Sequence, residues 1–254
     1  MTDSLLGVQQ DGGVRTLTLH SPENRNALSA RLLEQLELAL RDATSDAEVR
    51  AVVITGTGTV FCSGADLSER GSAAPNRMPH ILTMIVESAV PVIARVNGHA
   101  RAGGLGLICA ADMAAAAESS TFAFTEVRVG VAPAMILVPA LRVMDRRFLA
   151  RLTLTGERFG AHEAMAAGLL SAVTADGDAA LDEWVAERTT AIRQAAPGAT
   201  RATKGLLRDL PQHDWSEGLT TAAALSAELF AGAEAAEGME AFLQKRRPSW
   251  DTTE

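Results

Sequence analysis

The chain has 254 residues, of which 47% are hydrophobic, and it carries a formal net charge of −8 at pH 7. A chain of this length and hydrophobicity buries a sizeable core, either as one domain or as one domain with a helical appendage. The acidic balance argues against a nucleic-acid-binding protein and against a membrane protein with a polybasic surface.

The N-terminal residues, MTDSLLGVQQDGG, lack the basic-then-apolar pattern of a signal peptide, and no apolar run approaches the length of a membrane span. We therefore expect a cytoplasmic protein. Cys62 and Cys109 form no metal-ligand spacing with the five histidines. We expect a reducing compartment, no metal site and two cysteines that belong to the core.

The first part of the chain alternates predicted strands and helices. The elements expected in order are a β-hairpin (4–19), a helix with Ser29 as its N-cap, a buried strand (51–55), a glycine-rich segment (56–70), a mobile loop (71–79) and a helix (80–89). The apolar residues after Ser29 recur at helical spacing, and the strand reads AVVIT.

The stretch VIARVNGHARAGGLGLICAAD, residues 92–112, predicts a buried strand, a tight turn at Asn97-Gly98 and a helix that Gly103-Gly104 opens. Glycine allows close approach to the main chain, and a helix N-terminus directs unpaired N–H groups outward. Such a turn suits negative charge developing on an oxygen, although a helix start packed on a strand explains it equally well. Ser63-Gly64-Ala65 forms a second turn of this kind, and parallel strands bring both turns to one edge.

The second part of the chain becomes increasingly helical. The elements expected in order are strands (113–117 and 121–124), an irregular segment (125–133), helices from residue 135, a short strand (169–173) and a final helix (233–246). Strands and helices alternate to about residue 175 and only helices follow, which predicts an α/β core with an α-helical C-terminal part.

Six segments in order resemble the crotonase superfamily of enoyl-CoA hydratases and isomerases: SPENRNALS, VVITGTGTVFCSGADL, PVIARVNGHARAGGLGL, AADMAAAAESSTFAFTEVRVGVAP, LTGERFGAHEAMAAGLL and EGMEAFLQKRRP. The resemblance implies a ββα spiral core over residues 1–195 and a helical trimerisation region over 196–254. It further implies an acyl-CoA substrate, no cofactor beyond the coenzyme A that is part of that substrate, and a homotrimer or a hexamer built as a dimer of trimers.

The resemblance also implies a set of site residues. The N–H groups of Ala65 and Gly103 match the family's oxyanion hole, which holds the thioester oxygen as it becomes enolate-like. The residues that match coenzyme A contacts are Arg25, Ala27, Leu28, Ser63, Ala65, Asp66, Leu67, Phe242 and Lys245. Phe242 and Lys245 often act from a neighbouring subunit in this family, whereas a lysine at a helix end is also simply solvated.

At the acid-base residues, the chain matches only part of the family pattern. Family hydratases use two glutamates; the second is present as Glu126, whereas Gly106 stands at the position of the first. We expect an enoyl-CoA hydratase in which Glu126 positions the water, as in related hydratases of branched or glutaconyl-type acyl-CoAs that also carry this glycine. The alternatives are an isomerase that moves a proton with the single glutamate, and a non-catalytic acyl-CoA-binding homologue.

Three further residues leave alternatives open. Glu126 is either catalytic, with a pKa raised by an apolar pocket, or a helix cap or salt-bridge partner of Arg128. Arg101 stands where an apolar residue is usual, and it either meets a carboxylate on the acyl group or is a solvated arginine. His99 beside its turn is expected to be structural rather than a general base.

Overall fold

The computed structural model describes residues 4–69, 75–251 and 253 of the chain. Its strands form two sheets. The six-stranded sheet has the order β1 (Leu6–Asp11), β2 (Val14–Leu19), β3 (Ala51–Gly56), β5 (Val92–Val96), β7 (Met113–Ala117) and β10 (Ala172–Thr174). The four-stranded sheet has the order β4 (Val60–Cys62), β6 (His99–Arg101), β8 (Thr121–Ala123) and β9 (Phe159–Gly160). The pairs β1–β2 and β8–β9 are antiparallel, and the other pairs are parallel.

The helices connect these strands and then continue alone. They are α1 (Ala30–Ser45), α2 (Met78–Glu87), α3 (Gly103–Ala110), α4 (Ala134–Val143), α5 (Arg146–Thr155), α6 (Ala161–Ala166), α7 (Asp178–Gln194), α8 (Pro197–Asp209), α9 (Trp215–Phe230) and α10 (Ala233–Leu243). Short 3₁₀ turns are η1 (Pro22–Asn24), η2 (Leu67–Glu69), η3 (Glu126–Val129) and η4 (Leu210–Gln212). None of the helices in the described part of the chain is long and apolar enough to span a bilayer.

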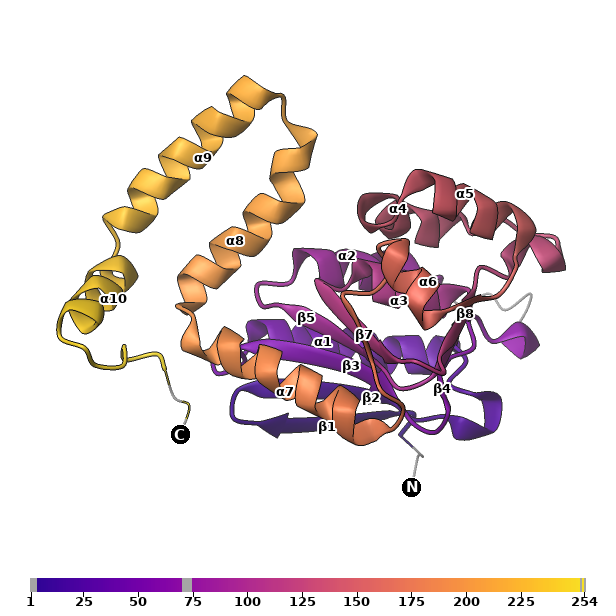
Figure 1. The fold of residues 1–254 in the computed structure, drawn as a ribbon. Coiled ribbons are helices and arrows are strands. Elements are labelled where there is room, and N and C mark those ends of the chain that lie inside the picture. The colour runs from indigo at the N-terminus through magenta and orange to yellow at the C-terminus, as the bar shows by residue number, and fades with distance from the viewer. Residues whose placement is uncertain (1–3, 70–74, 252, 254) are drawn as a thin grey trace.

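The chain repeats one unit three times in succession. A strand of the larger sheet is followed by a strand of the smaller sheet and then by a helix, first as β3, β4 and α2, next as β5, β6 and α3, and then as β7, β8 and α4. Each repeat therefore advances both sheets by one strand, which is the expected mixed α/β ββα spiral. Figure 1 shows the larger sheet with α1 on one side and α7 on the other.

The predicted local signals in the first part of the chain are confirmed. β1 and β2 form the hairpin with its turn after Asp11. The Ser29 side chain accepts a hydrogen bond from the Leu32 N–H and so caps α1. Every residue of β3 is buried because α7 packs on one face and the main core lies on the other. Side chains alternate across a strand, so Val53 packs with Val185 of α7 while Ile54 joins the main core.

Several boundaries differ from the sequence-based expectation. β6 and β9 were not predicted, because two or three residues carry no periodicity and these strands depend on pairing with β4 and β8. The prediction of a strand over 169–173 is wrong for its first residues, because β10 begins only at Ala172. Leu169 and Leu170 precede it as buried core residues. The segment expected to be irregular contains η3, and the last helix ends at Leu243 rather than 246. Residues 71–74 of the loop expected over 71–79 lie outside the described residues, and α2 already begins at Met78.

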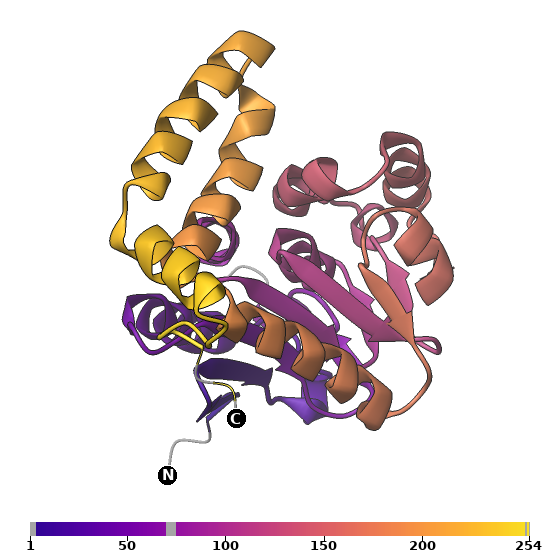
Figure 2. The ribbon, with the colours of Figure 1, turned by 60° about the vertical axis from the view of Figure 1, so that its left-hand side comes forward.

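The last three helices extend away from the sheets. Figures 1 and 2 show α8 and α9 as an antiparallel pair that projects from the body of the molecule, with α10 returning toward α7. No residue of α9 is buried, and α8 and α10 each bury one, Lys204 and Ala241. These helices therefore present most of their surface to the outside of the chain.

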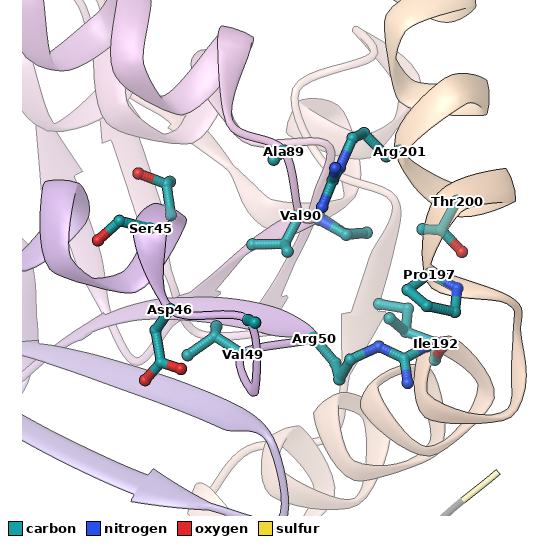
Figure 3. A pocket seen from close by; sticks show the side chains of 13 residues that line it. Ser45, Asp46, Val49, Arg50, Ala89, Val90, Ile192, Pro197, Thr200 and Arg201 are labelled. Atoms are coloured by element: carbon teal, nitrogen blue, oxygen red, sulfur yellow. Dashed lines mark hydrogen bonds between the residues drawn. The ribbon is translucent and has the colours of Figure 1, made fainter. Parts of the chain in front are cut away.

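Cationic side chains help attach this projecting part to the body, and one of them, Arg142 of α4, donates to the Arg208 carbonyl oxygen at 2.7 Å. The Lys204 ammonium donates to the carbonyl oxygens of Ile85 (3.0 Å) and Val90 (3.1 Å) and to the Asp112 carboxylate (2.7 Å). Arg50, which precedes β3, donates to the carbonyl oxygen of Ala195 at 2.6 Å. Figure 3 shows Arg50 beside a cavity of about 160 Å³ between the end of α1 and the start of α8.

Candidate active site

The two glycine turns lie against each other. β4 and β6 are parallel neighbours, so Ser63-Gly64-Ala65 and Ala102-Gly103 leave the smaller sheet at the same edge. A Cβ added to Gly64 would lie 2.8 Å from the Ala102 Cβ, and Gly64 has φ +97°. Both the conformation and the close approach therefore require glycine at position 64.

Two main-chain N–H groups at these turns are unpaired. A parallel bridge fixes the first turn, because the Leu28 N–H donates to the Gly64 oxygen and the Asp66 N–H donates to the Leu28 oxygen. The Ala65 N–H between them and the N–H of Gly103, the first residue of α3, have no hydrogen-bond partner among the described residues. The Ala65 nitrogen lies 4.0 Å from the position of a Cβ on Gly103, so the two donors are close together.

Ala102 holds an unusual main-chain conformation beside these donors. It has φ 45° and ψ −119°, a region that a residue with a Cβ rarely adopts. Its N–H donates to the Ala123 oxygen at 3.0 Å, and its own oxygen accepts from the Leu105 N–H at 2.9 Å. Hydrogen bonds on both sides therefore hold the strained peptide that orients Gly103.

A cavity of about 530 Å³ opens in front of the two turns. Ala65 and Gly103 line it together with the start of α2, the turn η3 and the start of α4. The lining is mostly apolar, with Met78, Val131 and Ile136 among its members. Its polar side chains are Ser63, Asp66, Glu69, Asn76, Thr125 and Glu126.

Glu126 lines this cavity without a partner for one carboxylate oxygen. Its Oε2 is buried and accepts no hydrogen bond from any residue that the structure describes. Burial raises the pKa of Glu126, and its own backbone N–H opposes that shift more weakly. The Arg128 Nε donates instead to the Thr155 oxygen at 3.1 Å, so the alternative of a Glu126–Arg128 salt bridge is wrong.

Gly106 lies one turn beyond Gly103 on α3, and the space next to it is filled. A Cβ on Gly106 would lie 2.5 Å from Ile136 Cγ2 and 3.2 Å from Met78 Cε. Both neighbours are buried and both line the cavity. The position where related hydratases carry their first glutamate is therefore occupied by two apolar side chains from α4 and α2.

The two segments that match coenzyme A contacts lie side by side. The Ser63 N–H donates to the Arg25 oxygen at 3.1 Å, and the Asn24 amide donates to the Asp66 carboxylate at 3.2 Å. Asp66 also accepts hydrogen bonds from the Ser68 hydroxyl and N–H, which lower its pKa and cap η2. The negative charge of Asp66 is thus engaged in fixing the loop that carries Ala65.

The predicted contact residues divide into three groups. Those that line the cavity are Leu28, Ser63, Ala65, Asp66 and Leu67. Arg25 is exposed and Ala27 is buried, and neither is among the lining residues. Phe242 and Lys245 are exposed at the end of α10, which Figures 1 and 2 place on the other side of the molecule from α4. This chain therefore does not bring them to its own cavity.

Arg101 and His99 serve the smaller sheet. The Arg101 guanidinium donates to the Thr121 hydroxyl at 2.8 Å and to the Thr121 carbonyl oxygen, and Arg101 does not line the cavity. The Thr121 N–H donates to His99 Nδ1 at 3.2 Å. The suggestion that Arg101 meets a substrate carboxylate in this cavity is therefore wrong, because its donors hold the start of β8.

Both cysteines are core residues, as expected. Cys62 ends β4, and a Cβ on Gly104 would lie 2.8 Å from the Cys62 Cβ, so α3 packs tightly on this strand. Burial raises the pKa of the Cys62 thiol to about 12 and that of the Cys109 thiol to about 12. Neither thiol is ionised at neutral pH.

Sequence reasoning missed the contact between Ile136 and Gly106. Ile136 lies 30 residues after Gly106, and no spacing in the sequence links the start of α4 to a glycine in α3. The positive φ of Ala102 likewise emerges only from the way that β6 enters α3.

Comparisons with known proteins place this geometry in a family. The model of the enoyl-CoA hydratase/isomerase family matches residues 9–253. A mitochondrial enoyl-CoA hydratase domain-containing protein 3 from Danio rerio is 34% identical, covering 100% of this chain and 90% of the relative. Among solved structures, enoyl-CoA hydratases from Mycobacterium smegmatis (TM-score 0.91, 33% identity, 98% and 100% covered) and Bacillus anthracis (TM-score 0.89, 29% identity, 98% and 100% covered) share the fold. The chain belongs to the enoyl-CoA hydratase/isomerase family, the crotonase superfamily.

Proposed function

We propose that this protein is an enoyl-CoA hydratase that uses Glu126 as its acid-base group. The observation that carries the proposal is the unpartnered, buried Oε2 of Glu126 in the same cavity as the unpaired N–H groups of Ala65 and Gly103. A carboxylate with a raised pKa exchanges protons near neutral pH more readily than an exposed one. Two main-chain donors supply the stabilisation that a thioester enolate needs.

The proposed reaction adds water across the double bond of a 2-enoyl thioester. Water oxygen bonds to C3 while Glu126 accepts one of its protons, and the π electrons move onto the thioester oxygen. Ala65 and Gly103 donate to that oxygen while it carries charge. The enolate then collapses, and the proton on Glu126 passes to C2, which restores the carboxylate. Each donor of this kind typically contributes about a hundred- to a thousandfold to the rate.

Isomerisation of a 3-enoyl thioester is the second candidate, and the filled space at Gly106 favours it. Glu126 would remove a proton from C2 and return it to C4, while the same two N–H groups hold the enolate. One carboxylate suffices for this shift. The apolar contacts of Ile136 and Met78 leave no place for a second carboxylate on α3.

The coenzyme A moiety is proposed to lie along the two paired segments, with Leu28, Ser63, Asp66 and Leu67 near its pantetheine end. Phe242 and Lys245 would act from a neighbouring copy in a homotrimer or a hexamer. The exposure of large apolar side chains on α9 and α10 supports such an assembly. A cytoplasmic location stays a prediction from the sequence.

The test is a parallel assay of the purified protein with a 2-enoyl-CoA and a 3-enoyl-CoA, and with the Glu126→Gln variant as control. Hydration that depends on Glu126 supports the proposal. Glu126-dependent isomerisation without hydration replaces it with the second candidate. If the protein binds both thioesters but turns over neither, it is a non-catalytic acyl-CoA-binding homologue and both proposals fail.

A further inference from the structure

We propose that Ile136 is a specificity-determining residue that sets the ratio of hydration to isomerisation in this cavity. The inference rests on the proposed function, since it concerns the fate of the proton on Glu126. Ile136 belongs to α4, whereas the oxyanion donors and Glu126 belong to the glycine turns and to η3.

The contact at Gly106 is too close for any side chain at that position. A Cβ there would lie 2.5 Å from Ile136 Cγ2 and 3.1 Å from Ile136 Cβ. Ile136 is only 3% exposed, so its side chain is held by its neighbours. A β-branched side chain in a helix is also restricted to essentially one χ1 rotamer. Ile136 therefore excludes a carboxylate side chain at position 106 by its volume.

Met78 extends this apolar surface to the oxyanion turn. Its Cε would lie 3.2 Å from a Cβ on Gly106 and 3.9 Å from a Cβ on Gly103. Positions 103 and 106 are one turn apart and share a face of α3. The surface formed by Ile136 and Met78 therefore borders the place where the thioester oxygen is proposed to bind.

This surface offers no hydrogen bond to a water molecule. An ordered water in a protein needs two to four polar partners, and the contacts around Gly106 are carbon atoms. A nucleophilic water therefore gains no hydrogen bond from this side of the cavity. Because this surface does not hold the water, hydration is slowed relative to isomerisation, in which the proton that Glu126 takes from C2 of a 3-enoyl thioester returns to C4. The C2–H bond breaks, the C4–H bond forms and the double bond moves, with no loss or gain of atoms.

The matched test compares Ile136→Thr with Ile136→Val. The two replacements have nearly the same shape and differ by a hydroxyl against a methyl group at the γ position. We expect Ile136→Thr to raise the ratio of hydration to isomerisation about fivefold above Ile136→Val, the worth of one added hydrogen bond to water. Both rates are measured on the same preparation, so partial loss of folded protein cancels from the ratio.

A second pair tests exclusion by volume. Gly106→Glu alone should destabilise the protein and add no hydration, because Ile136 occupies the space. Gly106→Glu together with Ile136→Ala should raise the ratio by about tenfold or more, since a second carboxylate then has room. Melting temperatures of all four variants confirm that the compared proteins are folded.

The outcomes separate the two proposals. If the protein hydrates the 2-enoyl thioester, but the ratio in Ile136→Thr stays within twofold of that in Ile136→Val and the ratio in the double variant stays within twofold of the wild type, the role of Ile136 is refuted and the proposed function stands. If neither the wild type nor any variant converts either thioester, the proposed function fails. The inference about Ile136 then fails as well.

Discussion

The spiral core and the C-terminal helices α8 to α10 differ in how far their apolar side chains are buried. In the core, β3 is completely buried between two layers, and the two glycine turns pack to within van der Waals contact. On the C-terminal helices, Trp215, Phe230, Phe242 and Leu243 are more than two thirds exposed. The core packs most of its apolar side chains against one another, whereas the C-terminal helices leave several of their largest ones exposed.

The difference assigns separate tasks to the two regions. Every group proposed to touch the reacting atoms lies in the core, and the core holds them by short hydrogen bonds to neighbouring turns. Lys204 and Arg50 attach the C-terminal helices at the opposite end of β5 from the cavity, and Arg142 of α4 adds a hydrogen bond to α8. Changes in the core should therefore alter chemistry, and changes in the C-terminal helices should alter assembly or stability.

The largest effect should follow from Glu126→Gln, which removes the acid-base group and leaves its volume. We expect turnover to fall by about a hundred- to ten-thousandfold while the Kd for coenzyme A stays within a few-fold. Steady-state kinetics and calorimetric titration measure the two. Glu69→Gln, in the same cavity but bonded to the Ala30 N–H, is the matched control. Equal losses in both variants would contradict a specific role for Glu126.

Lys204→Met should break the attachment of the C-terminal helices. Its loss leaves the Asp112 carboxylate and two carbonyl oxygens without their buried donor, at a cost of about 3 kcal/mol in the free energy of unfolding. Arg201→Met, on the same helix but exposed, should change stability by less than about 0.5 kcal/mol. Urea unfolding followed by circular dichroism compares them, and equal midpoints would show that Lys204 is not an anchor.

Phe230→Ser should weaken the assembly. Phe230 is exposed in the single chain and is expected to be buried in the proposed assembly. Its loss should raise the dissociation constant of the assembly about tenfold or more, with little change in the fold of each copy. Leu154→Ser serves as the control, because Leu154 is 77% exposed on α5 of the core. Light scattering over a dilution series reports the mass. A variant that dissociates no more readily than the control would exclude α9 from the interface.

Ala102→Gly should relieve the strain in the oxyanion turn. Glycine adopts φ 45° without a Cβ penalty, so we expect the free energy of unfolding to rise by about 1 kcal/mol. Ala150→Gly, at an exposed position within α5, should lower it by a similar amount. Thermal unfolding of both variants shows whether each substitution raises or lowers the stability. A loss of stability in both would mean that position 102 carries no strain.

The smallest effect concerns pH. Burial raises the pKa of Glu126, so the folded state favours its protonated form. The stability that this group contributes is complete below its unfolded pKa and is lost as the pH rises through the folded value. Glu126→Gln should therefore raise the melting temperature at pH 8 and change it little at pH 4. The opposite order would show that the carboxylate is stabilised when charged.

The features that could be predicted from the sequence are those that depend on a few neighbouring residues. The hairpin turn after Asp11, the Ser29 cap and the glycine at position 64 follow from the preferences of single residues. The family followed from six sequence segments in their order. Pairing of β6 with β4, the donors of Arg101 on Thr121 and the contact of Ile136 with Gly106 join distant segments. Such contacts depend on three-dimensional packing, for which a single sequence carries no periodic signal.

The two buried thiols have a practical consequence for labelling chemistry. Because Cys62 and Cys109 are shielded and hold pKa values of about 12, maleimide reagents find no reactive thiolate on the folded protein. A cysteine introduced at the half-exposed Met239 of α10 would thus be the single reactive site. The wild-type chain is a ready background for attaching one fluorophore or spin label and following the C-terminal helices in solution.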